Sequence, residues 1–462
     1  MQYRDFIENK KMKIITSGFD IDKSQINKML FSYQVDIVKW GLKKGKAALF
    51  SGTGTGKTAM QLEWANQVYK ETGKNVLILA PLAVSQQTVR EGLKFGIKVN
   101  ICRKQEDVLP GLNITNYEIL EHFKADEFIG IVLDESSILK SFNSKYKQLI
   151  IDMFKDTPYK LACTATPAPN DFVELGNHSE FLNILSRVEM LAMFFTHDGG
   201  ETSKWKLKGH AEIRFWEWMA TWAVVLEKPS DLGYSDEGFI LPKLNMHEII
   251  VKSPIFQDGG QISLLPTMAQ TLMERRQARR DSLNNRVQEA IKLINNEQWI
   301  VWCDLNVESE MLRKGIEGAI EVKGSDKDTH KVKSAIDFSN GDLKILVSKA
   351  SIFGFGLNFQ SCHNMIFVGL SDSYEQLYQA IRRCWRFGQK EEVNVWIITS
   401  EAEGAVKANI ERKEIESAKM IAEMVKHTQD ILTKEIHGTI NEKLDYQPTI
   451  EMILPTWLEE VA

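Results

Sequence analysis

Long apolar runs and paired cysteines are the features that this sequence most clearly lacks. The longest largely apolar run, residues 218–226, covers nine residues, whereas a membrane-spanning helix needs about 20. The first residues, MQYRDFIENKKMK, contain no apolar core of the kind that a signal peptide has. The five cysteines are scattered: Cys102, Cys163, Cys303, Cys362 and Cys384. Without a CxxC pair they exclude a disulfide framework and a zinc ribbon, so we expect a cytoplasmic protein without a membrane span.

The sequence also lacks a strong charge of one sign. Its 462 residues carry 57 basic and 62 acidic side chains, a net charge of −5. Residues 401–462 hold 13 acids and 7 bases, so this stretch carries −6 and the first 400 residues carry +1. Basic side chains cluster at 39–46, 275–286 and 382–390. Such clusters can bind the phosphates of a nucleic acid, but they can equally lie on a solvated surface.

Two blocks of the chain alternate short apolar runs with helical patterns. The runs of the first block are 46–50, 75–81, 111–117, 128–135 and 159–167, and those of the second are 298–303, 318–324, 343–350, 364–370 and 393–399. Continuous apolar runs are typical of parallel strands that helices cover on both faces. We therefore predict an α/β protein with two doubly wound parallel-sheet lobes.

The predicted organisation has five parts. They are an N-terminal extension (1–29), a first lobe (30–172), a mainly helical insertion or linker (173–290), a second lobe (291–400) and an acidic helical tail (401–462). Within the insertion, residues 215–226 (FWEWMATWAVVL) predict a buried helix and residues 267–295 a long, Arg-rich helix. The tail has apolar positions on one helical face: Ile415, Met420, Ile421, Met424 and Val425.

A glycine-rich segment, SGTGTGKT (51–58), follows the first predicted strand and precedes a helical run. This is the context that a phosphate-binding loop requires, although the first position is Ser51 where the strict pattern has glycine. Lys57 can neutralise the β- and γ-phosphates of a nucleotide, and the Thr58 hydroxyl can ligate magnesium. The backbone around the phosphates comes from Gly52, Thr53, Gly54, Thr55 and Gly56. A chance glycine-rich turn is the alternative.

Asp134 and Glu135 end the apolar run 128–135. Carboxylates at the C-terminal end of a parallel strand lie in the crevice where ligands bind. We predict that Asp134 holds magnesium and that Glu135 polarises the attacking water.

Residues 379–389, QAIRRCWRFGQ, predict a short helix with two arginines on one face. Arg383 and Arg386 could clamp phosphates, whereas a basic surface helix is the alternative. We predict that Arg386 is an arginine finger, that Arg383 shares its site, and that Arg382 points away.

An ordered set of segments resembles the motifs of superfamily-two helicases and translocases, especially the Swi/Snf-type branch. The segments are LFSYQVDIVKWGL (30–42), SGTGTGKT, LILAPLAVSQQTVREGLKF (77–95), ITNYEIL (114–120), IVLDESSILKSFNSKYKQ (131–148), LACTATPAPND (161–171), LPKLNMHEIIVKSP (241–254), WIVWCDLN (299–306), SKASIFGFGLNFQ (348–360) and QAIRRCWRFGQ. They cover residues 30–400. The runs GFGLNFQ, GLSDSYEQLYQAIRRCWRFGQ and FWEWMATWA look most like helicases encoded by phages and prophages.

The resemblance implies two RecA-like lobes with ATP and magnesium between them. It implies that Gln34 reads adenine and that the second lobe supplies Gly354, Gly356 and Gln379 beside the two arginines. It further implies that nucleic acid or its coupling to the ATP site involves Thr115, Asn116, Tyr117, Thr164 and Thr166.

The chain departs from the Swi/Snf pattern at several positions. The acid box reads DESS, so Ser137 lacks the polar reach usual at its position. Arg382 and Trp385 stand where those relatives have Asp and His.

Two further groups of side chains could contact nucleic acid. Arg275, Arg276, Arg279 and Arg280 predict a phosphate-tracking helix, with a solvated face as the alternative. Trp216, Trp218 and Trp222 could stack on bases, but their helical spacing favours core packing.

These features lead to the hypothesis of an ATP-driven DNA motor, acting on duplex or forked DNA in phage replication or recombination, with a possible protein partner at the acidic tail. An RNA helicase and an ATP-gated DNA clamp or loader stay open as alternatives. A small-molecule P-loop kinase is a poorer one, because it needs no second lobe with an Arg-rich motif.

Overall fold

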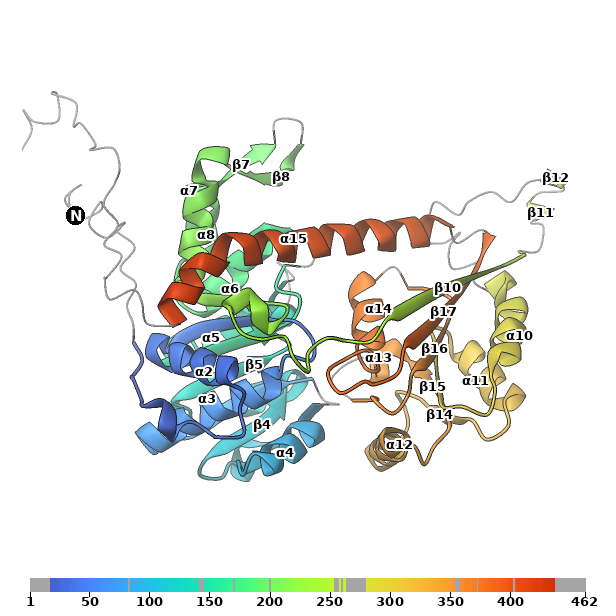
Figure 1. Cartoon of the computed structure of the whole chain (residues 1–462), viewed down its shortest axis with the longest axis horizontal. Coiled ribbons are helices and arrows are strands. Elements are labelled where there is room, and N and C mark those ends of the chain that lie inside the picture. The colour runs from blue at the N-terminus through green and yellow to red at the C-terminus, as the bar shows by residue number, and fades with distance from the viewer. Residues whose placement is uncertain are drawn as a thin grey trace, which may run out of the picture.

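The computed structural model contains two α/β lobes side by side, with one long helix crossing over both (Figure 1). The structure describes residues 17–81, 84–140, 145–168, 171–198, 201–252, 257–258, 261–262, 280–353, 358–371, 373–401 and 404–436. Both lobes are built around parallel sheets, as the sequence predicts.

The first lobe contains a seven-stranded sheet in the order β3-β4-β2-β5-β6-β1-β9, with every neighbouring pair parallel. Its strands are β1 (Lys46–Ser51), β2 (Val76–Ala80), β3 (Val99–Ile101), β4 (Leu112–Asn116), β5 (Gly130–Asp134), β6 (Tyr159–Thr164) and β9 (Ala223–Leu226). The five predicted strands are confirmed, and their side chains are buried on both faces as their continuous apolar runs indicate.

Helices pack on both faces of this sheet. They are α2 (Ser32–Lys44), α3 (Lys57–Thr72), α4 (Ser85–Lys94), α5 (Lys145–Met153), α6 (Leu175–Phe181), α7 (Arg187–Phe194) and α8 (Glu212–Ala220). Short 3₁₀ helices connect the elements: η1 (Lys23–Gln25), η3 (Gln105–Asp107), η4 (Tyr117–His122), η5 (Ala125–Glu127), η6 (Ser136–Lys140), η7 (Phe172–Glu174), η8 (Gly209–Ala211) and η9 (Pro229–Leu232). An antiparallel hairpin of β7 (Phe195–Asp198) and β8 (Glu201–Leu207) projects beside α7 (Figure 1).

The predicted helix over 215–226 is wrong in its second half. Helix α8 ends at Ala220, where the Thr221 hydroxyl donates to the Trp218 carbonyl oxygen at 2.6 Å. The following residues form β9, which pairs with β1. A short apolar run does not distinguish a buried helix from a buried strand, and the valines here favour the strand.

This strand changes the division of the chain, because lobe 1 does not end at residue 172. Helices α6, α7 and α8 share its hydrophobic core, and β9 completes its sheet. The core packing predicted for Trp216, Trp218 and Trp222 is confirmed, since all three are buried.

The second lobe contains a six-stranded parallel sheet in the order β10-β17-β16-β13-β15-β14. Its strands are β10 (Leu244–Val251), β13 (Trp299–Cys303), β14 (Ile320–Val322), β15 (Ile345–Lys349), β16 (Asn364–Val368) and β17 (Val393–Ser400). Its helices are α10 (Leu283–Leu293), α11 (Asn306–Gly315), α12 (Asp328–Asn340), α13 (Ala350–Phe353) and α14 (Tyr374–Ile381). A two-stranded ribbon of β11 (Gln257–Asp258) and β12 (Gln261–Ile262) follows β10. Strand β10, at the sheet edge, lies within the predicted linker.

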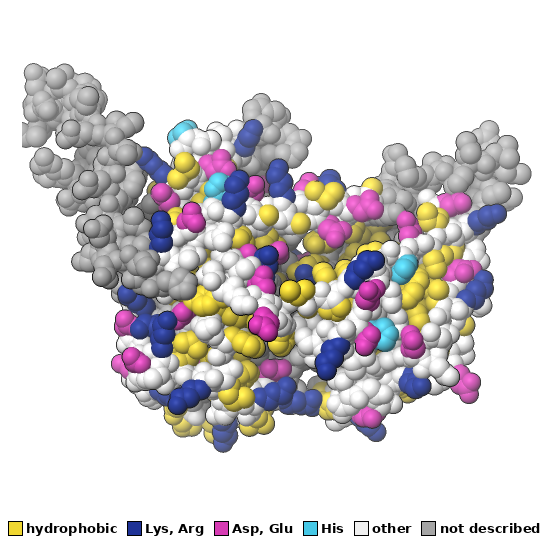
Figure 2. Space-filling view, in the orientation of Figure 1, with side chains coloured by type: hydrophobic (Ala, Val, Ile, Leu, Met, Phe, Trp, Pro, Cys, Tyr) yellow, Lys and Arg dark blue, Asp and Glu magenta, His cyan; other side chains and the backbone are white. Residues whose placement is uncertain are grey.

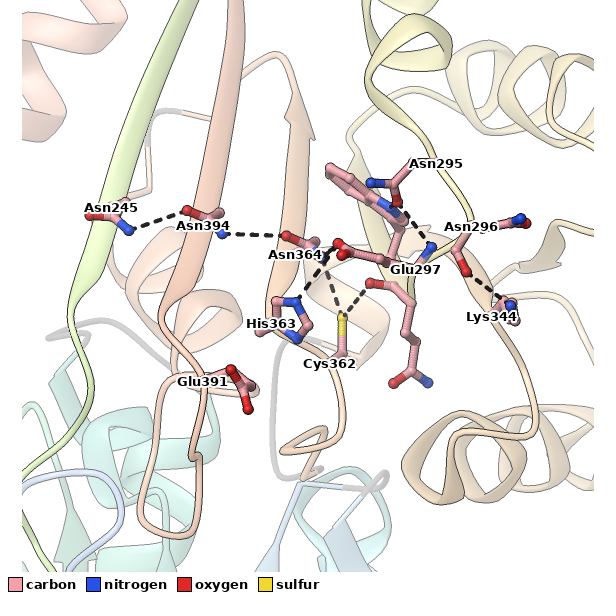
Figure 3. A network of polar contacts seen from close by, with 12 residues as sticks. Asn245, Asn295, Asn296, Glu297, Lys344, Cys362, His363, Asn364, Glu391 and Asn394 are labelled. Atoms are coloured by element: carbon pink, nitrogen blue, oxygen red, sulfur yellow. Dashed lines mark hydrogen bonds and ion pairs between the residues drawn. The ribbon is translucent and has the colours of Figure 1, made fainter.

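Near the starts of three neighbouring strands of this sheet, asparagine side chains form hydrogen bonds from one strand to the next (Figure 3). The Asn245 amide donates to Asn394 at 3.2 Å, and the Asn394 amide donates to Asn364 at 3.5 Å. The Asn364 amide in turn donates to the Glu297 carboxylate at 2.7 Å. Because the asparagines are register partners, these bonds fix β10 to β17 and β17 to β16.

A buried ion pair joins α10 to α11. The Arg286 guanidinium lies 2.8 Å from the Glu308 carboxylate, and both side chains are fully buried. Arg286 also donates to the Val368 carbonyl oxygen at 2.9 Å and to the Ser282 hydroxyl at 3.0 Å. The last arginine of the basic cluster 275–286 therefore belongs to the core of lobe 2 and not to a phosphate-binding surface.

The long helix is α15 (Gly404–Ile436), which continues from β17 of lobe 2 and lies across lobe 1 (Figure 1). Val406 and Ile410 pack in a core cluster of lobe 2. Met420 and Met424 pack in one core cluster of lobe 1, and Leu432 and Ile436 in another.

The predicted apolar face of the tail is partly confirmed. Ile421 and Val425 pack beside Met420 and Met424, whereas Ile415 is 68% exposed. In the space-filling view, basic and acidic side chains are interspersed over this face of the molecule (Figure 2). Within the described residues, no helix has both the length and the hydrophobicity that a membrane span requires.

Candidate active site

A cavity of about 310 Å³ lies between the two lobes. Lobe 1 contributes its glycine-rich loop and its acid pair, and lobe 2 contributes the turns that follow α14. Of the predicted site residues, the cavity is lined by Gln34, Thr53, Gly54, Gly56, Lys57, Thr58, Asp134, Glu135, Gln379, Arg383 and Arg386. Side chains more than 320 positions apart in the sequence thus meet at one site.

The glycine-rich loop connects β1 to α3 and packs closely against its surroundings. Gly54 and Gly56 have φ angles of 93° and 83°, a region that favours glycine. A Cβ atom on Gly56 would lie 2.2 Å from the Gln34 amide nitrogen, and one on Gly54 would lie 2.9 Å from the Phe387 backbone nitrogen. The second contact shows that the loop of lobe 1 touches the backbone of lobe 2.

Side chains of α2 hold the loop in place. The Tyr33 hydroxyl donates to the Thr55 carbonyl oxygen at 2.6 Å, and the Gln34 amide donates to the same oxygen at 3.0 Å. The Thr55 side chain is buried and donates to the Gly52 carbonyl oxygen at 2.8 Å. Thr55 therefore stabilises the loop from within, whereas the Thr53 hydroxyl has no partner among the described residues.

The ammonium group of Lys57 lies inside the loop, where it donates to the Ser51 carbonyl oxygen at 2.7 Å. Burial lowers the pKa of Lys57, and the negative charges of Glu135 and Asp134 oppose this shift. Lys57 and the acid pair line the same cavity, where a half-buried cation can meet phosphate oxygens.

The acid pair lies at the C-terminal end of β5. Burial, with the neighbouring charge of Glu135, raises the pKa of Asp134 to about 7, and the charge of Lys57 opposes the shift. Glu135 has a φ of 56°, an uncommon conformation for a residue with a side chain. Strained backbone of this kind is typical of functional sites.

Thr58 and Asp134 line the same cavity and offer a hydroxyl and a carboxylate oxygen, the donor types that magnesium prefers. In the described part of the chain, no group of three His, Cys, Asp or Glu side chains is placed to hold a metal ion. The two side chains fit a magnesium ion that also binds substrate phosphates.

The predicted helix over 379–389 is wrong, because α14 ends at Ile381 and both key arginines lie in the turns beyond it. Arg383 is buried and donates to the Gln379 carbonyl oxygen at 3.1 Å and to its amide oxygen at 3.0 Å. Gln379 thus orients Arg383. Arg386 donates to the Asn358 amide oxygen.

Burial lowers the pKa of Arg383 to about 9, with the charge of Arg386 acting in the same direction and those of Glu135 and Asp134 opposing it. Burial also lowers the pKa of Arg386 to about 10, opposed chiefly by Glu91. The buried Arg383 and the half-buried Arg386 both line the lobe-2 side of the cavity. Such a pair can bind an anion with more than one negative charge.

Arg382 does not line the cavity. Its guanidinium lies over the rings of Trp385, at 4.3 Å, and Tyr378, at 5.2 Å. The Trp385 ring donates to the Pro242 carbonyl oxygen at 2.7 Å. The two departures from the Swi/Snf pattern therefore pack together and attach this turn to the segment before β10.

Three phenylalanines that line the cavity are not among the predicted site residues. The ring of Phe239, which precedes β10, lies 5.1 Å from that of Phe31 and 4.9 Å from that of Phe387. Phe31 is 48% exposed, and Gln34 lies beside the cluster, so these rings could receive an aromatic base. No local pattern indicates the cluster, because its members come from three separate segments.

The residues predicted to couple the ATP site to nucleic acid do not line the cavity. Thr115, Thr164 and Thr166 are buried, and Thr166 donates its backbone N–H to the Thr164 hydroxyl at 3.1 Å. The Tyr117 hydroxyl donates to the Asp134 carbonyl oxygen at 2.6 Å, and Asn116 caps η4. Of these side chains, Tyr117 supports the acid pair directly, through the backbone of Asp134.

Other predicted residues fall outside the described part of the chain: Gly354, Gly356, Arg275, Arg276 and Arg279. Arg280 is exposed shortly before α10.

Two family models match the chain, one in each lobe. Residues 20–169 match the type III restriction enzyme res subunit, and residues 283–388 match the helicase conserved C-terminal domain. No curated protein matches the chain. The first match contains the glycine-rich loop and the acid pair, and the second contains Arg383 and Arg386.

Proposed function

We propose that this chain, which its two family matches indicate to be a helicase of superfamily two, is an ATP-dependent DNA translocase. One observation supports the proposal most strongly: a single cavity holds the phosphate loop and acid pair of lobe 1 together with the arginines of lobe 2. A site divided between two lobes can be completed or broken by their movement.

ATP would bind with its triphosphate along the loop that joins β1 to α3. Backbone N–H groups of the loop, the N-terminus of α3 and the Lys57 ammonium would meet the phosphate oxygens. The base would lie beside Gln34 and the phenylalanine cluster. Thr58 and Asp134 would hold magnesium, which when bound neutralises charge on the phosphates.

Hydrolysis would proceed by attack of water on the γ-phosphorus. Glu135 would accept the proton of the attacking water as the new P–O bond forms and the bond to ADP breaks. Arg383 and Arg386 would stabilise the negative charge that spreads over the γ-phosphoryl oxygens. Because these arginines belong to lobe 2, turnover would require the closed arrangement of the lobes.

Closure on ATP and reopening after hydrolysis would move the two lobes relative to each other along a bound strand. We infer that the strand is DNA, duplex or forked, and that the motor serves phage DNA replication or recombination. The motif resemblance of residues 30–400 to superfamily-two motors and to phage-encoded helicases supports this inference.

ATP hydrolysis should be measured with magnesium and no nucleic acid, and then with single-stranded DNA, duplex DNA, forked DNA and RNA. The proposal predicts stimulation by DNA that weakens steeply with salt, because phosphate contacts release counterions. Equal rates with and without every polynucleotide would contradict a motor, and stimulation by RNA alone would favour the RNA helicase.

A further inference from the structure

The acid pair of lobe 1 is followed directly by η6, whose last residue reaches the other lobe. The Lys140 ammonium forms an ion pair with the carboxylate of Glu375 in the first turn of α14. The two residues are 235 positions apart in the sequence and lie in different lobes. Lys140 and Glu375 are called the cross-lobe pair below.

Hydrogen bonds hold η6 as a firm connection between Glu135 and Lys140. The Ile138 N–H donates to the Glu135 carbonyl oxygen at 3.2 Å. The Asn177 amide of α6 donates to the Leu139 carbonyl oxygen at 2.8 Å and to that of Lys140 at 3.3 Å. A displacement of Lys140 would therefore be transmitted to the strained backbone of Glu135.

A second contact from α6 supports the beginning of η6. The Ser136 hydroxyl lies 3.1 Å from the Nε2 atom of His178, and both side chains are fully buried. Burial lowers the pKa of His178 to about 4, so the imidazole is neutral at physiological pH. The start and the end of η6 are thus both attached to α6.

On the other side of the cleft, Glu375 belongs to the helix that leads to the arginines. Ser373 caps α14 by accepting from the Gln376 N–H at 3.3 Å, and Glu375 lies one helical turn before Gln379. Gln379 in turn holds the Arg383 guanidinium through two hydrogen bonds. The cross-lobe pair therefore joins the element that directly follows Glu135 to the helix that directly precedes Arg383 and Arg386.

The cross-lobe pair can form only while the two lobes are close together. The Lys140 and Glu375 side chains are 33% and 14% exposed. When the lobes separate, both charges return to water, and their attraction at a distance is screened. The acid box DESS places a serine at position 137, and Ser137 is buried within lobe 1. Lys140, three residues further along η6, is the residue that pairs with the other lobe.

We propose that Lys140 and Glu375 are positioning residues for ATP hydrolysis, which align Glu135 with Arg383 and Arg386 when the lobes close. This inference rests on the proposed function. Neither residue lines the nucleotide cavity, so the pair acts through η6 and α14 and not by contact with ATP. The pair is partly buried, so it can also contribute to stability, and a role in catalysis must therefore appear in turnover.

The test is a charge-reversal cycle with Lys140→Glu, Glu375→Lys and the double variant that carries both. For each protein, kcat and KM for ATP are measured at saturating DNA, together with binding of a fluorescent ATP analogue and the thermal unfolding temperature. Each single variant should lose about tenfold or more in kcat with a nearly unchanged nucleotide affinity. The double variant should recover most of the loss, because the pair is restored with its charges exchanged.

The matched control is Lys314→Glu combined with Glu310→Lys. These residues form an ion pair at 3.0 Å within α11, with side chains 64% and 50% exposed. Neither single variant of this control pair should change kcat. Lys140→Arg, which keeps the charge, should retain most of the wild-type turnover.

Two results would overturn different parts of the account. If the wild-type protein does not hydrolyse ATP under any condition, the proposed function fails and the positioning role fails with it. If the wild-type protein is active and both single charge reversals keep its kcat, or if the double variant is no better than the singles, the positioning role alone is wrong.

Discussion

Asp134 has the most consequential ionisation in the site. Burial and Glu135 raise its pKa from 3.8 to about 7, so the carboxyl group of the nucleotide-free protein is largely protonated below that pH. A proton competes with a metal ion for the same oxygen atoms. We therefore predict that magnesium-dependent nucleotide binding weakens as the pH falls from about 8 to about 6.

The raised pKa of Asp134 also makes the stability of the folded protein depend on pH. Between pH 3.8 and about 7 the folded protein binds more protons at Asp134 than the unfolded chain does, so this group's contribution to stability falls as the pH rises through that range. Nucleotide titrations at several pH values check the binding prediction. In Asp134→Asn the dependence should disappear, and a wild-type affinity that is constant from about pH 6 to 8 would contradict the assignment.

Arg286 shows that a residue in a basic cluster can be purely structural. It is fully buried and pairs with Glu308, which is equally buried. Arg286→Ala would leave an uncompensated carboxylate in the core, at a cost of about 3–5 kcal/mol. We expect a marked loss of thermal stability, measured by calorimetry. Arg286→Met combined with Glu308→Leu should be far less harmful, because both charges are removed together; equal losses would contradict this account.

At the scale of elements, α15 forms a second connection between the lobes besides the segment before β10. Its C-terminal half has most of the contacts with lobe 1: Met424 is 1% exposed, and the rings of Trp216 and His427 stack at 5.4 Å. Near its end, Lys44 pairs with Glu435 at 2.5 Å. Lobe 2 holds the other end through β17, so a change in the distance between the lobes must bend or displace this helix.

Met424→Asp should release the C-terminal half of α15 from lobe 1. The buried charge would cost several kcal/mol, about the loss measured when large core side chains are removed. Limited proteolysis within residues 404–436 and thermal unfolding report the change. Ile415→Asp is the control, because Ile415 is 68% exposed and its substitution should stay within about 0.5 kcal/mol of the wild type. If both variants behave alike, α15 is not held as described.

The helices and strands also show which elements can be predicted from sequence patterns. Continuous apolar runs predicted ten strands, because a strand that is covered on both faces needs apolar side chains throughout. The sequence predicts helix where β9 forms, because the four apolar residues of β9 follow the aromatic helix α8 without a glycine or proline between them. The sequence does not indicate the end of α14 at Ile381 for a related reason, since residues 382–386 contain no helix-breaking residue.

At the scale of the whole molecule, the candidate site was predictable only where a motif is local. The loop at 51–58 and the acid pair could be assigned because strand, turn and carboxylate follow one another in the chain. The phenylalanine cluster and the cross-lobe pair depend on the approach of two lobes. Lys140 and Glu375 lie in ordinary polar segments, and no sequence pattern links two residues that are 235 positions apart.

The central claim is that one catalytic site is assembled from both lobes, and Arg386→Ala tests it most directly. Steady-state ATP hydrolysis is measured at saturating nucleotide and DNA, beside binding of a fluorescent nucleotide. An arginine that meets the transition state typically contributes about 10³–10⁵ in turnover. Arg382→Ala is the control from the same turn, since that guanidinium packs on Trp385 and Tyr378 away from the cavity. The account predicts a loss of this size for Arg386→Ala, nucleotide binding largely kept, and a mild effect for Arg382→Ala. Near-wild-type turnover of Arg386→Ala would contradict the assembly of the site from both lobes.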